Sequence, residues 1–365
     1  MGKNILILTN RDTGLYYFRR ELLQEMLDRG YKVSVSVPEG DFTDSLRFMG
    51  CNIIPTEVDR RGRNPLKDLK QLSAYKAMID DTKPDVVLTY TIKPNIYGGL
   101  AAISRKVSYM ANVTGLGTEI EKGGIASKAL MAMYRFGLRK AKCVFVQNMT
   151  IDAFLESHHI CSGRRKVIPG SGVNLEVHQY AEYPADEKEL HLLFIGRIMT
   201  DKGSNELLYA AEKIKKNYPH VVFDIVGRCD EEGFEQKIAQ ANDKGIVAFH
   251  GFQSDVRPYL IKAHALIQPS YHEGLSNVLL EAAATGRPVL ASNVPGCKET
   301  FEEGITGLGF EAKSGESLYS AIERFIALPY EKKKQMGEKG RLKVEKEFSR
   351  QTVVDCYMNE IDSIR

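Results

Sequence analysis

Residues 269–281 read PSYHEGLSNVLLE and contain two glutamates, Glu273 and Glu281, with seven residues between them. The apolar run Ala265–Gln268 before this stretch is typical of a buried strand, and the residues from Asn277 onward are typical of a helix. We therefore expect Glu273 in the loop that follows a strand and Glu281 on the next helix.

The start of this helix suits an anionic or hydroxyl-rich ligand. A helix N-terminus has N–H groups without partners, Gly274 lies beside it, and Ser276 is placed to cap it. Glu281 is flanked by leucines and alanines, where a lone carboxylate is costly to bury, whereas two vicinal sugar hydroxyls would supply two hydrogen-bond donors. The alternative is that Glu281 faces solvent, as most glutamates do. The loop before it favours the binding role.

A second stretch, residues 194–203, reads FIGRIMTDKG. Arg197 follows an apolar strand and Lys202 precedes a helix, and two cations beside a helix N-terminus suit a diphosphate. The alternative is a pair of solvated surface charges. The glutamate loop later in the same half of the chain favours the diphosphate.

Outward from these stretches, short apolar strands alternate with amphipathic helices, from Asn4–Thr9 onward and again from Leu190–Ile195. This alternation predicts βαβ units, and so an α/β fold of two tandem Rossmann-like domains whose parallel sheets face a central cleft. Two more helices are expected to close the chain. We assign the first domain to residues 1–170, a linker to 171–186 and the second domain to 187–348.

The loop Thr9–Leu15, TNRDTGL, joins the first strand to the first helix. Gly14 would let the backbone approach a ligand closely, although the loop lacks the G-x-G-x-x-G of a dinucleotide site. An ordinary strand-to-helix turn explains the loop equally well.

Charge is unevenly distributed. The chain carries a net charge of +3, but residues 1–170 hold 26 Lys and Arg against 17 Asp and Glu. The basic, apolar segment 122–142 predicts peripheral contact with an anionic membrane, and a core helix with a basic outer face is an equal alternative. The same basic surface could include Arg60, Arg61 and Arg63. Of the two interpretations, we slightly prefer a solvated loop for these three arginines.

Composition excludes several classes of protein. With 365 residues, 27% of them charged, the chain fits a soluble two-domain protein, and no apolar run approaches the length of a membrane span. Six scattered cysteines without a C-x-x-C pair disfavour disulfides and zinc knuckles, and fit a cytoplasmic protein. The first histidine is His158, and no D-x-D follows a strand, so we expect no essential metal. No nucleic-acid partner is expected.

On these residues the chain resembles glycosyltransferase family 4, the retaining sugar-nucleotide transferases of the GT-B fold. The matching elements are E-x7-E, at Glu273 and Glu281, and G-R-x4-K-G, at Gly196, Arg197, Lys202 and Gly203. The resemblance implies that Arg197 and Lys202 hold the donor diphosphate and stabilise it as it leaves. It also implies that Glu273 contacts the donor sugar and that Glu281 binds the ribose hydroxyls.

Further roles follow from the resemblance alone. Backbone amides of Gly274, Leu275 and Ser276 would bind the donor, Gly14 would close on the diphosphate, and Phe252 would lie near the base. The N-terminal domain would bind the acceptor, and the C-terminal helix, residues 349–365, would pack back on that domain. The donor, a UDP-sugar, is a substrate, and no cofactor is implied.

A narrower resemblance concerns the acceptor. The segments NVTGLG at 112–117, TGLYYFRREL at 13–22 and GRNPLKDL at 62–69 are similar to the branch of N-acetylgalactosaminyltransferases that act on undecaprenyl-diphosphate-linked saccharides. Thr114 stands about where many members of the family have a histidine. This branch implies work at the cytoplasmic face of the membrane, in bacterial polysaccharide or glycoprotein glycan assembly.

The leading hypothesis is therefore transfer of a hexose, an N-acetylhexosamine, from a UDP-sugar to a polyprenyl-diphosphate-linked saccharide. Front-side substitution with retention needs no protein base, because the departing phosphate can take the acceptor proton. Two alternatives stay open: an isomerase similar to UDP-N-acetylhexosamine 2-epimerases, and a non-catalytic sugar-nucleotide-binding subunit.

Overall fold

The computed structural model describes residues 2–56, 65–115, 120, 123–161, 163–185 and 189–364. The chain divides into two compact units. Unit 1 comprises Met1–Ser171 with Gln351–Arg365, and unit 2 comprises Gly172–Arg350.

Unit 1 contains a seven-stranded parallel sheet in the order β3-β2-β1-β4-β5-β6-β7, and the strand order reverses between β1 and β4. Its strands are β1 Asn4–Leu8, β2 Lys32–Val37, β3 Asn52–Pro55, β4 Val86–Tyr90, β5 Ser108–Val113, β6 Cys143–Val146 and β7 Arg165–Val167. Its helices are α1 Asp12–Asp28, α2 Thr43–Phe48, α3 Pro65–Thr82, the π-helix η1 Pro94–Gly98, α4 Gly99–Arg105, α6 Gly124–Leu138, α7 Met149–Ser157 and α14 Arg350–Asp362.

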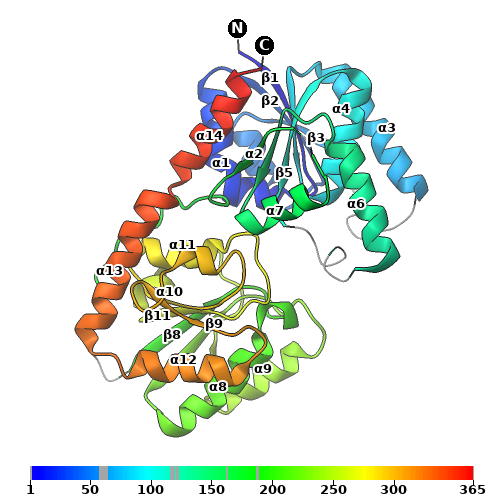
Figure 1. Ribbon diagram of the computed structural model, residues 1–365. Helices are drawn as coiled ribbons and strands as arrows, with labels where there is room; N and C mark the ends of the chain where they lie inside the picture. The colour runs from blue at the N-terminus through cyan, green and yellow to red at the C-terminus, as the bar shows by residue number, and fades with distance from the viewer. Residues whose placement is uncertain are drawn as a thin grey trace. The chain divides into compact units, whose positions relative to one another are not determined.

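Both faces of this sheet are covered, which is why its central strands β1, β4, β5 and β6 are largely apolar and buried. Along β1, Ile5 and Ile7 pack with α1 and α14, whereas Leu6 and Leu8 pack with α3, α4 and α6 on the opposite face. Figure 1 shows these two groups of helices on either side of the sheet. The C-terminal helix α14 is part of this core, and its Tyr357 ring stacks on Phe145 with centroids 4.1 Å apart.

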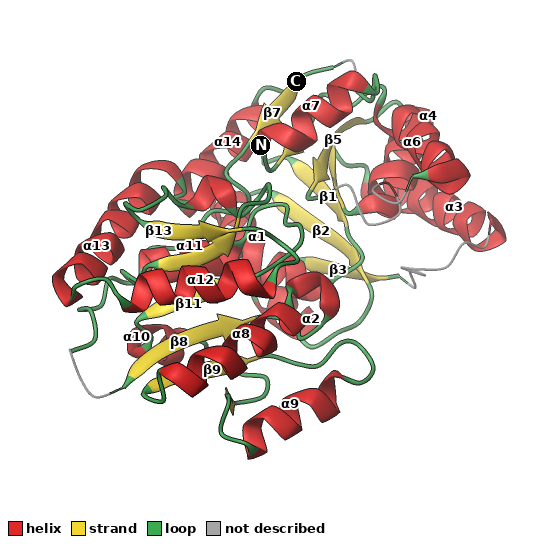
Figure 2. Cartoon of the chain, turned by 60° about the horizontal axis from the view of Figure 1, so that its bottom comes forward, coloured by secondary structure: helices red, strands yellow, loops and turns green. Residues whose placement is uncertain are grey.

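Unit 2 repeats the arrangement with a six-stranded parallel sheet in the order β10-β9-β8-β11-β12-β13. Its strands are β8 Leu190–Ile195, β9 Val221–Val226, β10 Ala248–Phe249, β11 Ala265–Gln268, β12 Val289–Ser292 and β13 Gly307–Phe310. Its helices are η2 Thr200–Lys202, α8 Ser204–Asn217, α9 Phe234–Asp243, α10 Arg257–Lys262, α11 Asn277–Ala284, η3 Lys298–Thr300, α12 Gly315–Ile326 and α13 Tyr330–Glu347. Helices α8, α9 and α12 cover one face, and α10 and α11 the other. In unit 2, Figure 2 shows the strands β8, β11 and β13 with the helices α8 and α12 beside them.

The expectation of two similar α/β domains is confirmed, and three details differ. Three helices close the chain instead of two, because α13 separates α12 from α14. The strand β13, with the glycine-rich sequence GLGF, has little apolar signal and was not expected. From Gly172 onward the segment interpreted as a linker packs on unit 2, where the buried Arg287 donates hydrogen bonds to the backbone oxygens of Ala181 and Glu182.

Candidate active site

Two glycines of unit 2 pack against the loop that carries Glu273. Gly203 has a φ of +72°, and a Cβ there would lie 2.1 Å from the backbone oxygen of Pro269. Gly296 has a φ of +83°, and a Cβ there would lie 2.4 Å from the backbone oxygen of Glu273. Side chains at either position would force the loop away. The G-R-x4-K-G and E-x7-E elements are therefore joined by backbone packing.

This packing brings Lys202 and Glu273 into direct contact. Lys202 Nζ forms an ion pair with Glu273 Oε1, and the two side chains are only 19% and 15% exposed. The same oxygen accepts a hydrogen bond from Ser270 Oγ at 2.8 Å and one from Gln268 Nε2 at 3.3 Å. The ammonium group is thus fixed at the end of β11, directly before α11.

Arg197 lies at the end of β8 but is paired elsewhere. Its Nη1 donates to Asp230 Oδ2 at 2.9 Å, and both side chains are about half exposed. An exposed ion pair of this kind is worth little, about 0–1 kcal/mol, so an anionic ligand can replace it at small cost.

The helix α11 begins without the side-chain cap that the sequence suggested. Ser276 is the N-cap residue, but its side chain makes no capping hydrogen bond, and its backbone N–H donates to Gly296 O at 2.8 Å. Its neighbour Leu275 is buried in the apolar cluster between α11 and α13. Within the part of the chain that the structure describes, the buried Asn277 Oδ1 has no hydrogen-bond partner. The helix start is therefore anchored by its backbone, and its first turn keeps polar capacity for a ligand.

Glu281 projects from α11 among apolar neighbours. The residue is half-buried, and burial raises the pKa of its carboxyl group to about 7, against a smaller lowering by the Arg350 guanidinium. A carboxyl group in this state can ionise fully when hydroxyl donors approach. Of the four side chains expected to meet, the structure joins Lys202 and Glu273 by contact, pairs Arg197 with Asp230 and places Glu281 farther along α11.

An exposed aromatic ring follows β10, and a buried polar cluster is centred on Asp224 within β9. Phe252 is 53% exposed and has the Arg228 guanidinium 4.0 Å from its ring centroid. Nearby, Asp224 accepts from His191 Nδ1 and His250 Nε2, both at 2.7 Å, and these histidines lower the pKa of its carboxyl group although burial opposes them. The exposed face of Phe252 is suited to stacking on a planar base.

Gly14 lies in the first turn of α1 rather than in a loop before it. A Cβ there would meet no atom of the described protein within 4 Å, so the space beside it is open to a ligand. Thr114 follows β5 and is exposed. The basic side chains Arg60, Arg61, Arg63 and Lys122 lie outside the described residues.

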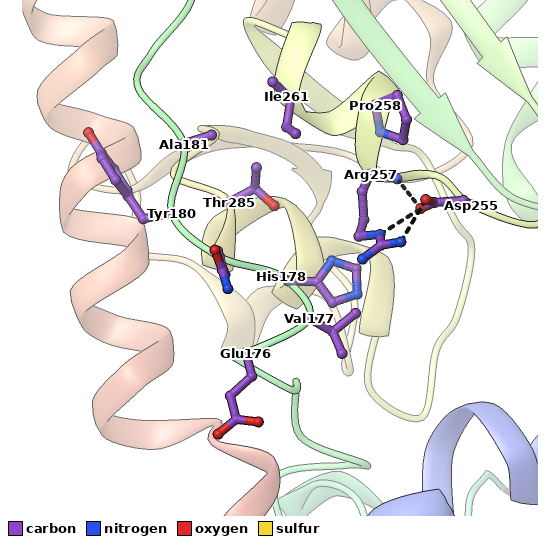
Figure 3. Close-up of a pocket in the computed structure, with 11 residues that line it drawn as sticks. Glu176, Val177, His178, Tyr180, Ala181, Asp255, Arg257, Pro258, Ile261 and Thr285 are labelled. Carbon is purple, nitrogen blue, oxygen red and sulfur yellow. Dashed lines mark hydrogen bonds and ion pairs between the residues drawn. The ribbon is translucent and has the colours of Figure 1, made fainter.

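A separate cavity of about 440 Å³ lies in unit 2, beside the segment 176–181 and the start of α10. Figure 3 shows the His178 ring near Arg257, which pairs with Asp255 at 2.7 Å. Burial, reinforced by the Arg257 charge, lowers the pKa of His178 to about 4, so the ring is neutral. The residues lining this cavity include none of those predicted to bind a ligand. Within the described ranges, no cluster of three or more His, Cys, Asp or Glu side chains could hold a metal ion.

Two family models match this chain. Residues 179–343 match the family model "Glycosyl transferases group 1", and residues 4–148 match "Glycosyl transferase 4-like". The chain belongs to these glycosyltransferases. The first match contains Arg197, Lys202, Glu273 and Glu281.

Curated relatives of this glycosyltransferase cover most of its length. It is 26% identical over 335 residues to the N,N'-diacetylbacillosaminyl-diphospho-undecaprenol alpha-1,3-N-acetylgalactosaminyltransferase of Campylobacter jejuni, a match that covers 87% of this chain and 88% of the relative. It is 27% identical over 325 residues to the UDP-Gal:alpha-D-GlcNAc-diphosphoundecaprenol alpha-1,3-galactosyltransferase of Escherichia coli, covering 83% and 81%.

Solved structures confirm the GT-B fold of the glycosyltransferase. Anabaena Alr3699/HepE, solved with UDP and glucose, superposes with a TM-score of 0.81 over 99% of this chain and 100% of that one, at 18% identity. The sucrose-phosphate synthase of Thermosynechococcus elongatus gives a TM-score of 0.80, covering 98% of each chain at 21% identity.

Two contacts within unit 2 were not predicted from the sequence. Asp224 interrupts the apolar strand VVFDIV, and a carboxylate in such a strand signals a buried partner. The partners His191 and His250 are far from Asp224 in sequence and could not be paired with it. Gly296 lacks a local signal altogether, because its role is a close approach to Glu273.

The pKa of Glu281 gives a testable pH dependence. Ribose hydroxyls that donate to the carboxylate stabilise its ionised form, so UDP binding should lower this pKa and release a proton below pH 7. We expect UDP affinity to rise with pH and to level off above about pH 7. Calorimetry at pH 6.5 in two buffers of different ionisation enthalpy measures the released proton.

The Glu281→Gln variant is the control, because it should bind UDP more weakly and without proton release. UDP affinity should rise with pH, whereas in the free protein the same raised pKa makes the free energy of unfolding fall as the pH rises. Its stabilising contribution is complete below the ordinary pKa of 4.5 and is lost as the pH rises to about 7. Proton release of equal size in wild type and Glu281→Gln would contradict the assignment.

Proposed function

We propose that the chain is a retaining, metal-independent glycosyltransferase that moves a hexose, an N-acetylhexosamine, from a UDP-sugar to a polyprenyl-diphosphate-linked saccharide. The observation that carries the proposal is the Lys202–Glu273 pair, fixed by Gly203 and Gly296 directly before α11. The relatives from Campylobacter jejuni and Escherichia coli, whose names specify undecaprenyl-diphosphate-linked acceptors, support the acceptor class. The proposed reaction needs no cofactor, because the UDP-sugar donor is a substrate.

Unit 2 supplies the groups that a departing UDP requires. Lys202 and Arg197 would neutralise the charge that develops on the diphosphate as the bond from its oxygen to the sugar C1 breaks. The amides at Gly274, Leu275 and Ser276 would add hydrogen bonds, with Glu273 on the sugar and Glu281 on the ribose. Phe252 would stack on the base.

The acceptor hydroxyl would attack C1 from the face that the diphosphate leaves, which retains the anomeric configuration. Its proton would pass to the departing phosphate oxygen, so that UDP leaves with the proton and no protein base is consumed. The cleavage resembles other glycosidic chemistry in its oxocarbenium character. Thr114 stands about where many members of the family have a histidine, and it fits this route because a hydroxyl is not a general base near neutral pH.

Transfer itself is the test. The purified protein is incubated with each of UDP-N-acetylgalactosamine, UDP-N-acetylglucosamine, UDP-galactose and UDP-glucose, with and without an undecaprenyl-diphosphate-linked saccharide. We expect acceptor-dependent UDP release with one N-acetylated donor and a product of unchanged anomeric configuration by NMR. Isomerisation of the UDP-sugar without acceptor would show an epimerase, and tight UDP binding without turnover would show a binding subunit.

A lipid-linked acceptor requires contact with the membrane, and α6 has a suitable exposed face. Ile125 and Phe136 are 88% and 56% exposed. Lys128 is exposed on the same helix, and Arg139 and Lys140 are exposed directly after its end. In Figures 1 and 2, α3 lies in the same group of helices as α6, and its Leu66 and Leu69 are also exposed. No described helix is long and apolar enough to span a bilayer. We propose that this surface rests on the cytoplasmic face of an anionic membrane.

Removing charge from α6 should weaken membrane binding. Each Lys or Arg near an anionic surface contributes about 1 kcal/mol, so replacing Lys128, Arg139 and Lys140 with alanine should reduce binding to phosphatidylglycerol vesicles by up to about 100-fold. Vesicle sedimentation measures the effect. The matched control replaces Lys332, Lys339 and Lys346, which are exposed on α13. An equal loss in both triple variants would reject α6 as the membrane surface.

A further inference from the structure

The sheet of unit 1 has a place where ligands are expected on topological grounds. Strand order reverses between the neighbours β1 and β4, and in open parallel sheets ligands bind beyond the carboxyl ends of the strands at such a point. The last paired residues there are Leu8 of β1 and Thr89 of β4. Asn10 and Thr91 each stand two residues farther along these strands, so they leave the sheet side by side.

Both residues carry a buried oxygen without a partner. Asn10 Oδ1 and Thr91 Oγ1 make no hydrogen bond within the described protein, although each atom is shielded from solvent. Buried polar atoms are nearly always paired, and an unpaired one indicates a partner that the protein does not itself provide. Two such oxygens on adjacent strand ends indicate a ligand that donates hydrogen bonds.

The backbone at Thr91 supports the same conclusion. Its φ is +72°, a left-handed conformation that is a genuine outlier for a β-branched residue. Lys83, Lys106 and His159 also have positive φ, but each follows a helix, where this conformation ends the helix normally. Thr91 follows a strand and precedes the π-helix η1, so helix termination does not explain it. Strained backbone conformations of this kind are concentrated at ligand-binding and active sites.

The side chains of Thr89, Asn95 and Asn112 near this strand end are hydrogen-bonded, whereas Tyr90 Oη, like the two oxygens, has no partner within the described protein. Thr89 Oγ1 donates to Asn95 Oδ1 at 2.7 Å, Asn95 Nδ2 donates to Asn112 O at 2.8 Å, and Asn112 Nδ2 donates to Thr89 O at 3.0 Å. The backbone N–H of Asn95 also donates to Thr91 O at 3.0 Å. These bonds tie β4, η1 and β5 together and hold Thr91 in its strained conformation.

We propose that Asn10 and Thr91 bind the saccharide of the lipid-linked acceptor. Sugar hydroxyls and acetamido N–H groups are the donors that Asn10 Oδ1 lacks, and the Thr91 hydroxyl can accept from one hydroxyl and donate to another. The inference rests on the proposed transferase function and adds the residues that select the acceptor. It predicts that substitutions at these two positions raise the KM for the acceptor and leave the KM for the donor unchanged.

The decisive experiment separates the two substrates. Thr91→Gly and Asn10→Ala should each raise the acceptor KM about tenfold, the loss of one hydrogen bond, with the donor KM within about twofold of wild type. Thr91→Ser keeps the hydroxyl and should stay close to wild type. Lys106→Gly is the matched control, because it also relaxes a left-handed residue of unit 1. An unchanged acceptor KM, or an equal rise in both KM values, would overturn the proposal.

Two further measurements test the strained backbone at Thr91 and the binding of the acceptor saccharide independently of catalysis. Thr91→Gly relieves the positive φ and should melt no lower than wild type, so a lower melting temperature would contradict the strained geometry itself. Calorimetric titration with the lipid-free acceptor saccharide monitors the same site without catalysis. If wild type binds this saccharide and the two variants do not, the site stands even where no transfer is found. If transfer occurs with wild-type KM values in both variants, only the inference about the acceptor fails.

Discussion

Replacing Lys202 with alanine is expected to lower kcat for transfer by about 10²–10³-fold, the usual loss when one preorganised electrostatic group is removed from a leaving charge. The side chain of Lys202 is 19% exposed and its ammonium group is held against Glu273, so it needs little reorganisation as the diphosphate departs. The same change leaves the Glu273 carboxylate without its cation, which should cost about 1–3 kcal/mol of stability. Steady-state kinetics and thermal melting measure the two effects separately.

A double-mutant cycle and a matched ion pair complete this prediction. Glu273→Gln should also reduce kcat strongly, and the combination with Lys202→Ala should lose much less than the product of the two single effects, because the residues act as a unit. The control is Lys213→Ala, which breaks the exposed 2.7 Å pair with Glu316 in the same unit. Full activity in Lys202→Ala would reject the site.

Gly203→Ala should damage both folding and catalysis. The residue has a φ of +72°, and its new Cβ would lie 2.1 Å from the oxygen of Pro269, at the start of the Glu273 loop. We expect a loss of roughly 2–5 kcal/mol in the free energy of unfolding from the left-handed backbone and the clash together. Because a displacement near 1 Å can cost about 10²-fold in rate, kcat should fall even where the variant folds.

Gly233→Ala is the matched control for this clash. Gly233 also precedes a helix of unit 2 with a positive φ of +86°, but a Cβ there meets no described atom within 4 Å. Its variant should lose only about 1 kcal/mol, the cost of the left-handed conformation, and should keep wild-type kcat. Equal losses of unfolding free energy in the two variants would show that the clash with Pro269 does not contribute to the effect of Gly203→Ala. Chemical denaturation and initial rates decide the comparison.

The fold was predictable because the alternation of apolar strands with amphipathic helices is visible in short stretches of sequence and is repeated along the chain. Apolar strands such as Leu190–Ile195 are buried on both faces and read as continuous hydrophobic runs, so the alternation with helices was visible. The strand Gly307–Phe310 was missed because two of its four residues are glycines, which match no strand pattern. Helix α13 was missed because it is strongly charged and because two of its five buried positions are glycines, Gly337 and Gly340, which give no apolar signal.

The site was predictable only in part, for a related reason. Residue types and spacing identified Lys202 and Glu273, and the structure joins them. Sequence spacing could not show that Arg197 is paired with Asp230, nor that Ser276 anchors α11 by its backbone rather than by its hydroxyl. Such details depend on contacts between distant segments, and they decide which groups are available to a ligand.

The central claim is that unit 2 holds a sugar nucleotide through Lys202, Arg197, Glu273 and Glu281. A crystal structure of the protein soaked with UDP-N-acetylhexosamine tests it most directly. We predict diphosphate oxygens within hydrogen-bond distance of Lys202 and Arg197, with Arg197 released from Asp230, and ribose hydroxyls on the Glu281 carboxylate. A nucleotide bound elsewhere in unit 2, such as the cavity beside His178, with these four side chains untouched, would contradict the account.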